Sequence, residues 1–408
     1  MTDPTGRSFL SYRRLRSQEA ALLIAAQHDH GIPTWQDIQN LGAVPTEDEI
    51  RRTLADQATA SAILFITPEV EASTIIRNVE IPKIIQRAEA GDGFFVVPIA
   101  AGGLDYATAA SISSNSLSAQ NLADWNMHKA PDPTLSPEGA AQVAGRVLTH
   151  RIQAVHRHLA AGDNLRVGLF VRRSPAIEPG IALTLDWSPR FAGKEADPTV
   201  WEEILLPSLS RISNVIRHHA PGRHVEAFGL PTLPAALALG CAFLITGGIG
   251  LSWRQITPGR PDQFWSLSTA QEPAGFTARI RSKDPSARDI AALVSVADNA
   301  EPLFAACQRD LPPLRALVHV QPPGAYPHQI ASPGEAVDIA MTVQQGLRTV
   351  RREYGNIGTI HLFMAAPAGL AVLVGQFLNT FGAIQTYEHV VADGSGRYRP
   401  AALLHPCA

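Results

Sequence analysis

The sequence has few cysteines, few charged residues and no long apolar run. Its 408 residues include 3 cysteines, which lie too far apart for a disulfide framework or a zinc site. We therefore expect a protein of the reducing cytoplasm, with no bound metal. The most apolar stretch, residues 235–251, is interrupted by threonine and glycine and is shorter than the roughly 20 residues that span a bilayer.

The charge balance excludes further classes of protein. Charged residues make up 17% of the chain, and the formal net charge is -3 at pH 7. A general nucleic-acid-binding protein would be basic, so we expect no DNA partner. No G-x-G-x-x-G motif follows a predicted strand, which argues against a Rossmann dehydrogenase. The length suits two or three globular domains.

Short apolar runs alternate with helical patterns in the first 150 residues. The runs at 7–12, 32–35, 61–67 and 94–99 are expected to be strands. Strands that alternate with helices predict a parallel, doubly wound α/β sheet. Ligands of such sheets lie beyond the carboxyl ends of the strands.

The segment ASTIIRNVEIPKII carries a single acid, Glu80, among aliphatic residues. On a helix, Ile76 and Glu80 share one face, and a carboxylate on an apolar face is paired, at the rim, or in use. Pro82 lacks a backbone N–H, so the helix should kink or begin there. The alternative is that Glu80 is an ordinary surface acid that pairs with Arg77 or Lys83.

Three stretches, SFLSYRR, GIPTWQDIQNLGAVP and SAILFITPEVEASTIIRNVEIP, resemble a bacterial TIR domain. The resemblance implies a flavodoxin-like domain over residues 1–155. In catalytic members of this family, a glutamate in the third stretch cleaves the nicotinamide–ribose bond of NAD+, and it matches Glu80. The tryptophan that usually stands four residues earlier is Ile76 here, which is a departure from the pattern.

A lone carboxylate suits this chemistry. Nicotinamide leaves as a neutral base, so no general acid is needed, and a nearby carboxylate stabilises the oxocarbenium-like ribose. The resemblance and the positions at strand ends predict these substrate-binding residues: Tyr12, Arg13, Trp35, and Asn40, Leu41 and Gly42 of the loop after the second strand. For Tyr12 and Trp35 the alternative is core packing, and for Arg13 it is a solvated charge.

The second half contains an internal repeat with a spacing of 135 residues. The strand at 181–187 matches that at 316–322, and Gly240 matches Gly375 (375 − 240 = 135). Each copy has the pattern strand, long helix, strand, proline-containing loop and short apolar helix. This predicts a pseudo-symmetric α/β pair with a shared cleft. Chance likeness between apolar strands is the alternative.

The second half also resembles a SAVED domain, which consists of two fused CARF-like, Rossmann-like units. The resemblance covers residues 156–408, with repeats at about 165–275 and 276–408, and its most specific part is HLFMAAPAGLAVLVGQFLNTFGAIQTYEH. Members of the family bind cyclic oligonucleotides. Turns before helices offer N–H groups for phosphate, and aromatic rings such as Trp187, Trp253 and Trp265 could stack on bases.

The resemblance, with these positions, predicts the following cyclic-nucleotide-binding residues: Arg172, Arg173, Arg190, Lys194, Thr232, Tyr326, Ala366 and Pro367. For each of them, a surface ion pair or core packing is the alternative.

Together the two halves resemble TIR-SAVED effectors of bacterial antiviral CBASS systems. The resemblance implies an NAD+ glycohydrolase that needs no cofactor. A cyclic oligoadenylate, expected to be a trinucleotide, would activate it through head-to-tail oligomers or filaments and so deplete NAD+. The alternative hypothesis, motivated by Ile76, is a non-catalytic TIR scaffold that only assembles when the ligand binds.

Overall fold

The computed structural model describes residues 1–35, 46–114, 126–175, 178–191, 195–257, 259–392 and 395–406. The chain forms two compact units. The first unit comprises Met1–Gly168, Pro175–Leu185 and His218–Ala220. The second unit comprises Leu169–Ser174, Asp186–Arg217 and Pro221–Ala408. Within the described ranges, no helix is long and apolar enough to cross a membrane.

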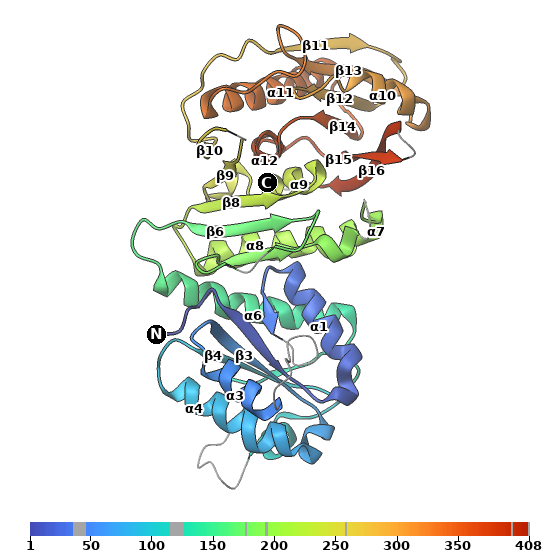
Figure 1. The fold of residues 1–408 in the computed structure, drawn as a ribbon. Helices are drawn as coiled ribbons and strands as arrows, with labels where there is room; N and C mark the ends of the chain where they lie inside the picture. The colour runs from blue at the N-terminus through green and yellow to red at the C-terminus, as the bar shows by residue number, and fades with distance from the viewer. Residues whose placement is uncertain are drawn as a thin grey trace. The chain divides into compact units, whose positions relative to one another are not determined.

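The first unit is built on a parallel sheet (Figure 1). Its 5 strands lie in the order β2-β1-β3-β4-β5, and every neighbouring pair is parallel. This is the flavodoxin-like strand order. The strands are β1 (Arg7–Ser11), β2 (Thr34–Trp35), β3 (Thr59–Ile66), β4 (Phe95–Ala100) and β5 (His128–Lys129). The parallel α/β sheet predicted from the sequence is thus confirmed.

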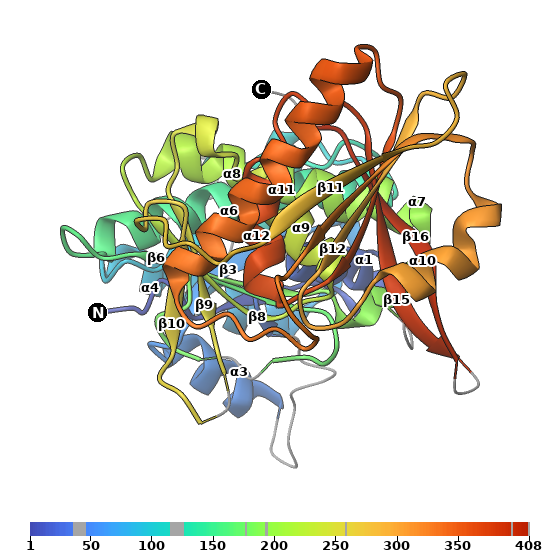
Figure 2. The ribbon, with the colours of Figure 1, turned by 90° about the horizontal axis from the view of Figure 1, so that it is seen from above.

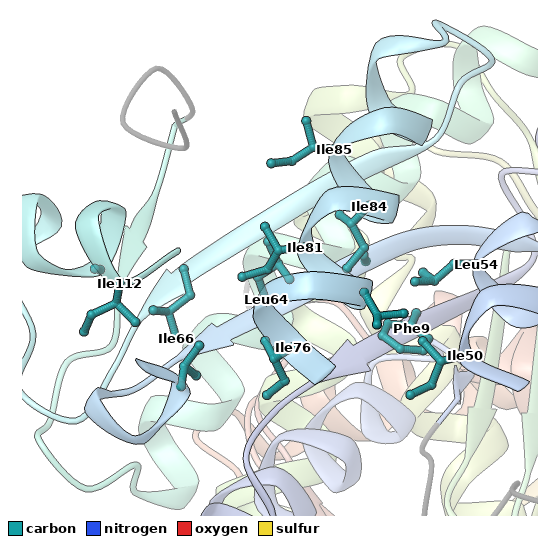
Figure 3. Packing of buried hydrophobic residues seen from close by; sticks show 14 of the residues in the cluster. Phe9, Ile50, Leu54, Leu64, Ile66, Ile76, Ile81, Ile84, Ile85 and Ile112 are labelled. Atoms are coloured by element: carbon teal, nitrogen blue, oxygen red, sulfur yellow. The ribbon is translucent and has the colours of Figure 1, made fainter. Parts of the chain in front are cut away.

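Helices surround this sheet. They are α1 (Ser17–Asp29), α3 (Thr46–Ala55), α4 (Ile81–Glu89), α5 (Tyr106–Ser113) and α6 (Pro137–His158). One apolar core joins α3, α4 and α5 to β1 and β3, and Figure 3 shows Phe9, Leu64 and Ile84 within it. Helix α1 packs against α6 instead. The apolar stripe of α4 therefore faces the sheet, as its pattern predicts.

Two further sheets follow. One has the order β10-β9-β8-β6-β7, and the other has the order β11-β13-β12-β14-β15-β16. The strands are β6 (Leu165–Phe170), β7 (Leu183–Asp186), β8 (Val225–Leu230), β9 (Leu251–Gln255), β10 (Gln263–Ser266), β11 (Thr277–Ser282), β12 (Asp289–Ser295), β13 (Leu314–Gln321), β14 (Ile360–Ala365), β15 (Ile384–Ala392) and β16 (Ser395–Leu404). The helices are α7 (Pro198–Val200), α8 (Leu206–His219), α9 (Leu233–Ala242), α10 (Glu301–Cys307), α11 (Pro333–Tyr354) and α12 (Ala368–Gln376).

These two sheets share one topology. The order β10-β9-β8-β6-β7 corresponds to β16-β15-β14-β12-β13, to which β11 is added. In both sheets the last pair, β9 with β10 and β15 with β16, is antiparallel. The helical segment Pro198–His219 corresponds to Pro333–Tyr354, because both ends differ by 135 positions (333 − 198 and 354 − 219). The two copies therefore keep the same spacing through their long helices.

Helices α9 and α12 pack against each other at a pair of glycines (Figure 2). A Cβ atom on Gly240 would lie 2.2 Å from the carbonyl oxygen of Val372, and one on Gly375 would lie 2.4 Å from that of Leu237. Val372 and Leu237 are themselves 135 positions apart (372 − 237). Equivalent backbone atoms therefore meet across an approximate two-fold axis, where a side chain at either glycine would clash.

Two π-helical turns arise from the same local pattern. The turn Ile76–Glu80 is closed by an N–H of Ile81 that donates to the carbonyl of Ile76, and Pro82 follows. The turn Trp201–Leu205 is closed in the same way, and Pro207 follows at the equivalent position. Because proline has no N–H, the usual helical bond four residues back is missing, and the wider turn forms instead. Pro82 thus lies in the first turn of α4, directly after the wider turn, and the backbone is helical on both sides of it.

Candidate functional sites

Glu80 is the last residue of the first π-helical turn, in the segment that follows β3. Its side chain is only 7% exposed, and Ile76 and Val79 of the same turn are buried in the core of the unit. Lys83 donates to Gln86 Oε1 at 3.1 Å, and Arg77 donates to the carbonyls of Glu71 and Ser114. Glu80 is therefore a buried acid rather than a solvated surface one. Its catalytic role stays a prediction.

Two predicted substrate-binding residues lie at the sheet edge where β3, the strand before Glu80, also ends. Tyr12 and Arg13 directly follow β1, the neighbour of β3. Tyr12 is buried, and the Nε atom of Arg13 is buried without an acceptor among the described residues. Parallel sheets of this kind bind ligands at this edge. The topology thus brings two of the predicted substrate-binding residues to the same edge as the segment that carries Glu80.

An ion cluster that the sequence did not reveal lies at this edge. Arg16 donates from Nη2 to Glu69 Oε1 at 2.7 Å and from Nη1 to Glu19 Oε1 at 2.8 Å. These bonds raise the pKa of Arg16, and the bond to Arg16 holds the pKa of Glu69 at about 2. Arg16 and Glu69 are 53 positions apart, so no local motif links them.

Trp35 lies in the core of the first unit. Its ring stacks on Phe9 with centroids 5.0 Å apart, and the indole is buried. It also lines a polar cavity of about 350 Å³ with Arg7 and Thr59, which begin β1 and β3. This is the packing alternative that the sequence left open. The predicted loop residues Asn40, Leu41 and Gly42 lie outside the described residues.

In the second unit, Arg172 and Thr232, which follow strands, meet Glu388, which lies within β15. We call them the arginine–glutamate cluster. Arg172 follows β6 and donates from Nη2 to Glu388 Oε1 at 3.0 Å. Thr232 follows β8 and caps α9 by accepting from the N–H of Ala235, and its hydroxyl lowers the pKa of Glu388.

Glu388 is the unusual member of this cluster. It is only 5% exposed, and burial raises the pKa of its carboxyl to about 7 in spite of the hydrogen bonds from Thr232 and Arg172. Its Oε2 atom is buried and accepts no hydrogen bond of ordinary geometry from the described part of the chain. On the adjacent strand β16, Arg399 stands opposite Glu388 and pairs with Glu195. The cluster thus contains a poorly satisfied acid beneath an accessible guanidinium, since the side chain of Arg172 is 52% exposed.

The other predicted nucleotide-binding residues have varied surroundings. Arg173 is exposed, and Arg190 and Tyr326 are half-buried. Ala366 and Pro367 precede α12, and the N–H of Gly369 in its first turn donates to Gln255 Oε1 at 3.3 Å. Lys194 lies outside the described residues. The side-chain carbonyl of Gln255, in β9, therefore already accepts from one of the backbone N–H groups at the start of α12.

The three tryptophans suggested as base-stacking platforms are core residues. Trp187 packs edge-on against Trp201, with ring centroids 6.1 Å apart. Trp253 and Trp265 pack against Gly369, where a Cβ atom would lie 2.8 and 2.7 Å from them. All three indoles are buried. The expectation that they stack on bases is wrong, because packing partners bury their rings.

A cavity of about 990 Å³ lies beside the two helices of the first copy, between α8, α9 and the end of β16 from the second copy. In the second copy, α11 packs against α12 and β10 at the equivalent place. The short helices α9 and α12 differ in side-chain size at three pairs of equivalent positions, 135 residues apart. In each pair the first copy has the smaller side chain: Ala238 and Leu373, Cys241 and Gln376, Ala242 and Phe377. The first copy is thus hollow where the second carries larger side chains.

Comparisons with known proteins bear on the second unit. Residues 209–404 match the family model described as "SMODS-associated and fused to various effectors sensor domain", abbreviated SAVED. This part of the chain therefore matches the SAVED domain that the sequence predicted. No curated protein matches the chain significantly.

Solved structures of Cap4 SAVED/CARF-domain containing receptors are also similar. The Acinetobacter baumannii receptor with the cyclic trinucleotide 3'3'3'-cAAA has 14% identity and a TM-score of 0.50, with 97% of this chain and 100% of that chain covered. The same receptor with 2'3'3'-cAAA has 16% identity and a TM-score of 0.49, over 90% of this chain and 86% of that chain. The Moraxella osloensis receptor has 13% identity and a TM-score of 0.44, over 97% and 100%. The likeness at a TM-score of 0.50 is one of fold.

Proposed function

We propose that the SAVED domain of this chain senses a cyclic oligonucleotide and that the N-terminal unit cleaves NAD+ when the sensor is occupied. The match of residues 209–404 to a sensor domain carries the first part of this proposal. The buried Glu80 after β3 of a parallel sheet in the order 2-1-3-4-5 supports the second part. The resemblance of the N-terminal stretches to TIR domains supplies the reaction.

The arginine–glutamate cluster suits a phosphate of the messenger. Arg172 presents an accessible guanidinium, which binds phosphate through two parallel hydrogen bonds. Thr232 precedes α9, a helix of 10 residues, and the positive end of the helix dipole at this N-terminus favours an anion. The similar Acinetobacter baumannii Cap4 receptor was solved with the cyclic trinucleotide 3'3'3'-cAAA, and we propose a cyclic triadenylate as the ligand here.

Glu80 suits cleavage of the nicotinamide–ribose bond. Its carboxylate would stabilise the positive charge that develops on the ribose, and burial strengthens this interaction because the local dielectric is low. Tyr12 and Arg13, at the end of the neighbouring strand, would hold the rest of the dinucleotide. Self-association through a head-to-tail contact, which gives open filaments, would bring N-terminal units together and activate them. The outcome would be depletion of NAD+ as an antiviral defence.

The test is NAD+ loss by the purified full-length chain with a panel of cyclic di- and trinucleotides. We expect cleavage only with the matching nucleotide, and Glu80→Gln should abolish it without changing assembly measured by light scattering. The control Glu89→Gln changes an exposed acid at the end of the same helix and should retain activity. Undiminished cleavage by Glu80→Gln would refute the catalytic assignment.

The same panel separates the two candidate functions. If the wild-type chain assembles with a nucleotide but consumes no NAD+ under any condition, the N-terminal unit is a scaffold, which is the alternative that Ile76 favours. The sensor is tested by calorimetric titration with cyclic triadenylate. Arg172→Ala should weaken binding at least about tenfold, since a charged hydrogen bond to phosphate is lost. Arg352→Ala, which changes an exposed arginine of α11, should bind normally.

A further inference from the structure

We propose that Glu388 is an internal competitor for the ligand's phosphate, which holds Arg172 in the empty sensor and must release it when the ligand binds. This inference rests on the proposed function of the SAVED domain and adds a form of regulation to it. A carboxylate and a phosphate use the same face of a guanidinium, so one arginine edge cannot serve both at once.

The geometry sets the competition. Arg172 Nη2 lies 3.0 Å from Glu388 Oε1, with the arginine side chain 52% exposed and the glutamate side chain 6% exposed. The guanidinium therefore faces solvent, while the carboxylate that holds it lies below. An incoming phosphate reaches Arg172 from the solvent side and, when it binds the edge that includes Nη2, competes with Glu388 for that nitrogen.

If Arg172 is released to the phosphate, Glu388 remains as a buried carboxylate without a cation beside it, which is unfavourable. Its Oε2 atom is buried and accepts no ordinary hydrogen bond from any described residue, and only its neighbours Thr232 and Arg172 favour its charged form. Arg399 faces it across β15 and β16, but that arginine is paired with Glu195, whose charge also opposes ionisation of Glu388. A buried carboxylate that loses a cation and gains a phosphate neighbour takes up a proton from water.

This proton uptake links ligand binding to pH. Burial places the pKa of Glu388 at about 7 in the empty sensor, so the acid is mostly ionised at pH 8 and mostly protonated at pH 6. If the bound state requires the protonated form, linkage weakens binding by roughly tenfold at pH 8 and hardly at all at pH 6. The affinity for the cyclic nucleotide should therefore rise as the pH falls through 7.

Glu388→Gln is the direct test, because it keeps the shape of the side chain and removes the charge. Calorimetric titration with cyclic triadenylate at pH 8 should show binding roughly tenfold tighter than wild type, and the difference should shrink at pH 6. The gain should be absent when Arg172→Ala is added. Glu353→Gln, which changes an exposed acid of α11, should bind like wild type at both pH values.

The outcomes separate this inference from the proposed function. Wild-type binding that does not depend on pH, or a Glu388→Gln variant that binds equally or more weakly, would overturn the competition and identify the carboxylate as a ligand contact or a structural group. A wild-type chain that binds no cyclic nucleotide would overturn the sensor function itself, and the competition with it. A gain that persists without Arg172 would show that Glu388 acts by general repulsion and would also overturn the inference.

Discussion

Replacing Glu388 with glutamine should change how the stability of the protein depends on pH, even without ligand. The pKa of this carboxyl rises from its ordinary 4.5 to about 7 on folding because the group is buried. Between these values the folded chain binds one more proton than the unfolded chain, so the free energy of unfolding falls as the pH rises. The decrease begins near pH 4.5 and is complete above pH 7.

The size of this effect follows from the same two values. At about 1.4 kcal/mol for each pH unit, the rise from 4.5 to about 7 corresponds to a total loss of about 3 kcal/mol. About 2 kcal/mol of this falls between pH 5.5 and pH 8. Glutamine cannot ionise, so Glu388→Gln should gain about 2 kcal/mol relative to wild type over that interval.

Urea unfolding of both chains at pH 5.5 and pH 8 measures this difference. Comparing the two chains cancels the other titrating groups, and comparing the two pH values cancels the constant cost of the lost hydrogen bond from Arg172. Glu353→Gln is the control, since an exposed acid should leave the pH dependence unchanged. If the free energy of unfolding changes equally between pH 5.5 and pH 8 in wild type and Glu388→Gln, the pKa of Glu388 is not raised by burial.

Three further changes test the duplicated architecture and the first unit. Gly240→Ala should destabilise the chain by about 3 kcal/mol in urea unfolding because its Cβ would meet a carbonyl oxygen at 2.2 Å, whereas Gly324→Ala, in open space, should be neutral. Leu373→Ala should cost about 2–5 kcal/mol in the same assay, while the equivalent Ala238→Leu, which points into the 990 Å³ cavity, should cost nothing. Arg151→Met should lower the melting temperature in calorimetry because the fully buried guanidinium donates to three backbone carbonyls, which would lose their partner; an unchanged melting temperature would contradict this.

Local patterns predicted the elements of the fold well. Alternating apolar runs predicted the parallel sheet of the first unit, and the 135-residue spacing predicted equivalent helices in the two copies. Proline chemistry predicted an irregularity in the helix beside Pro82, and a π-helical turn ends just before it. These features depend on neighbouring residues or on regular repetition, which a single sequence displays directly.

Long-range pairing could not be predicted in this way. Arg172 was a candidate because it follows a strand, but its partner Glu388 lies 216 positions away within an ordinary-looking strand. Trp265 was expected to be available for stacking, yet Gly369, about one hundred positions later, encloses it. In both cases the partner is set by how α9 and α12 bring the copies together, and the sequence carries no local mark of that contact.

The unequal copies also bear on how such a domain diversifies. In a homodimer, any substitution is present twice, so a hollow beside one helix would have its mirror image beside the other. Here both halves belong to one polypeptide, and Ala238 can remain small while Leu373 fills the corresponding space. Covalent fusion therefore allows a mutation to reshape one half of the domain alone. The contact of α9 and α12 at Gly240 and Gly375 depends on both halves, so it keeps their packing the same.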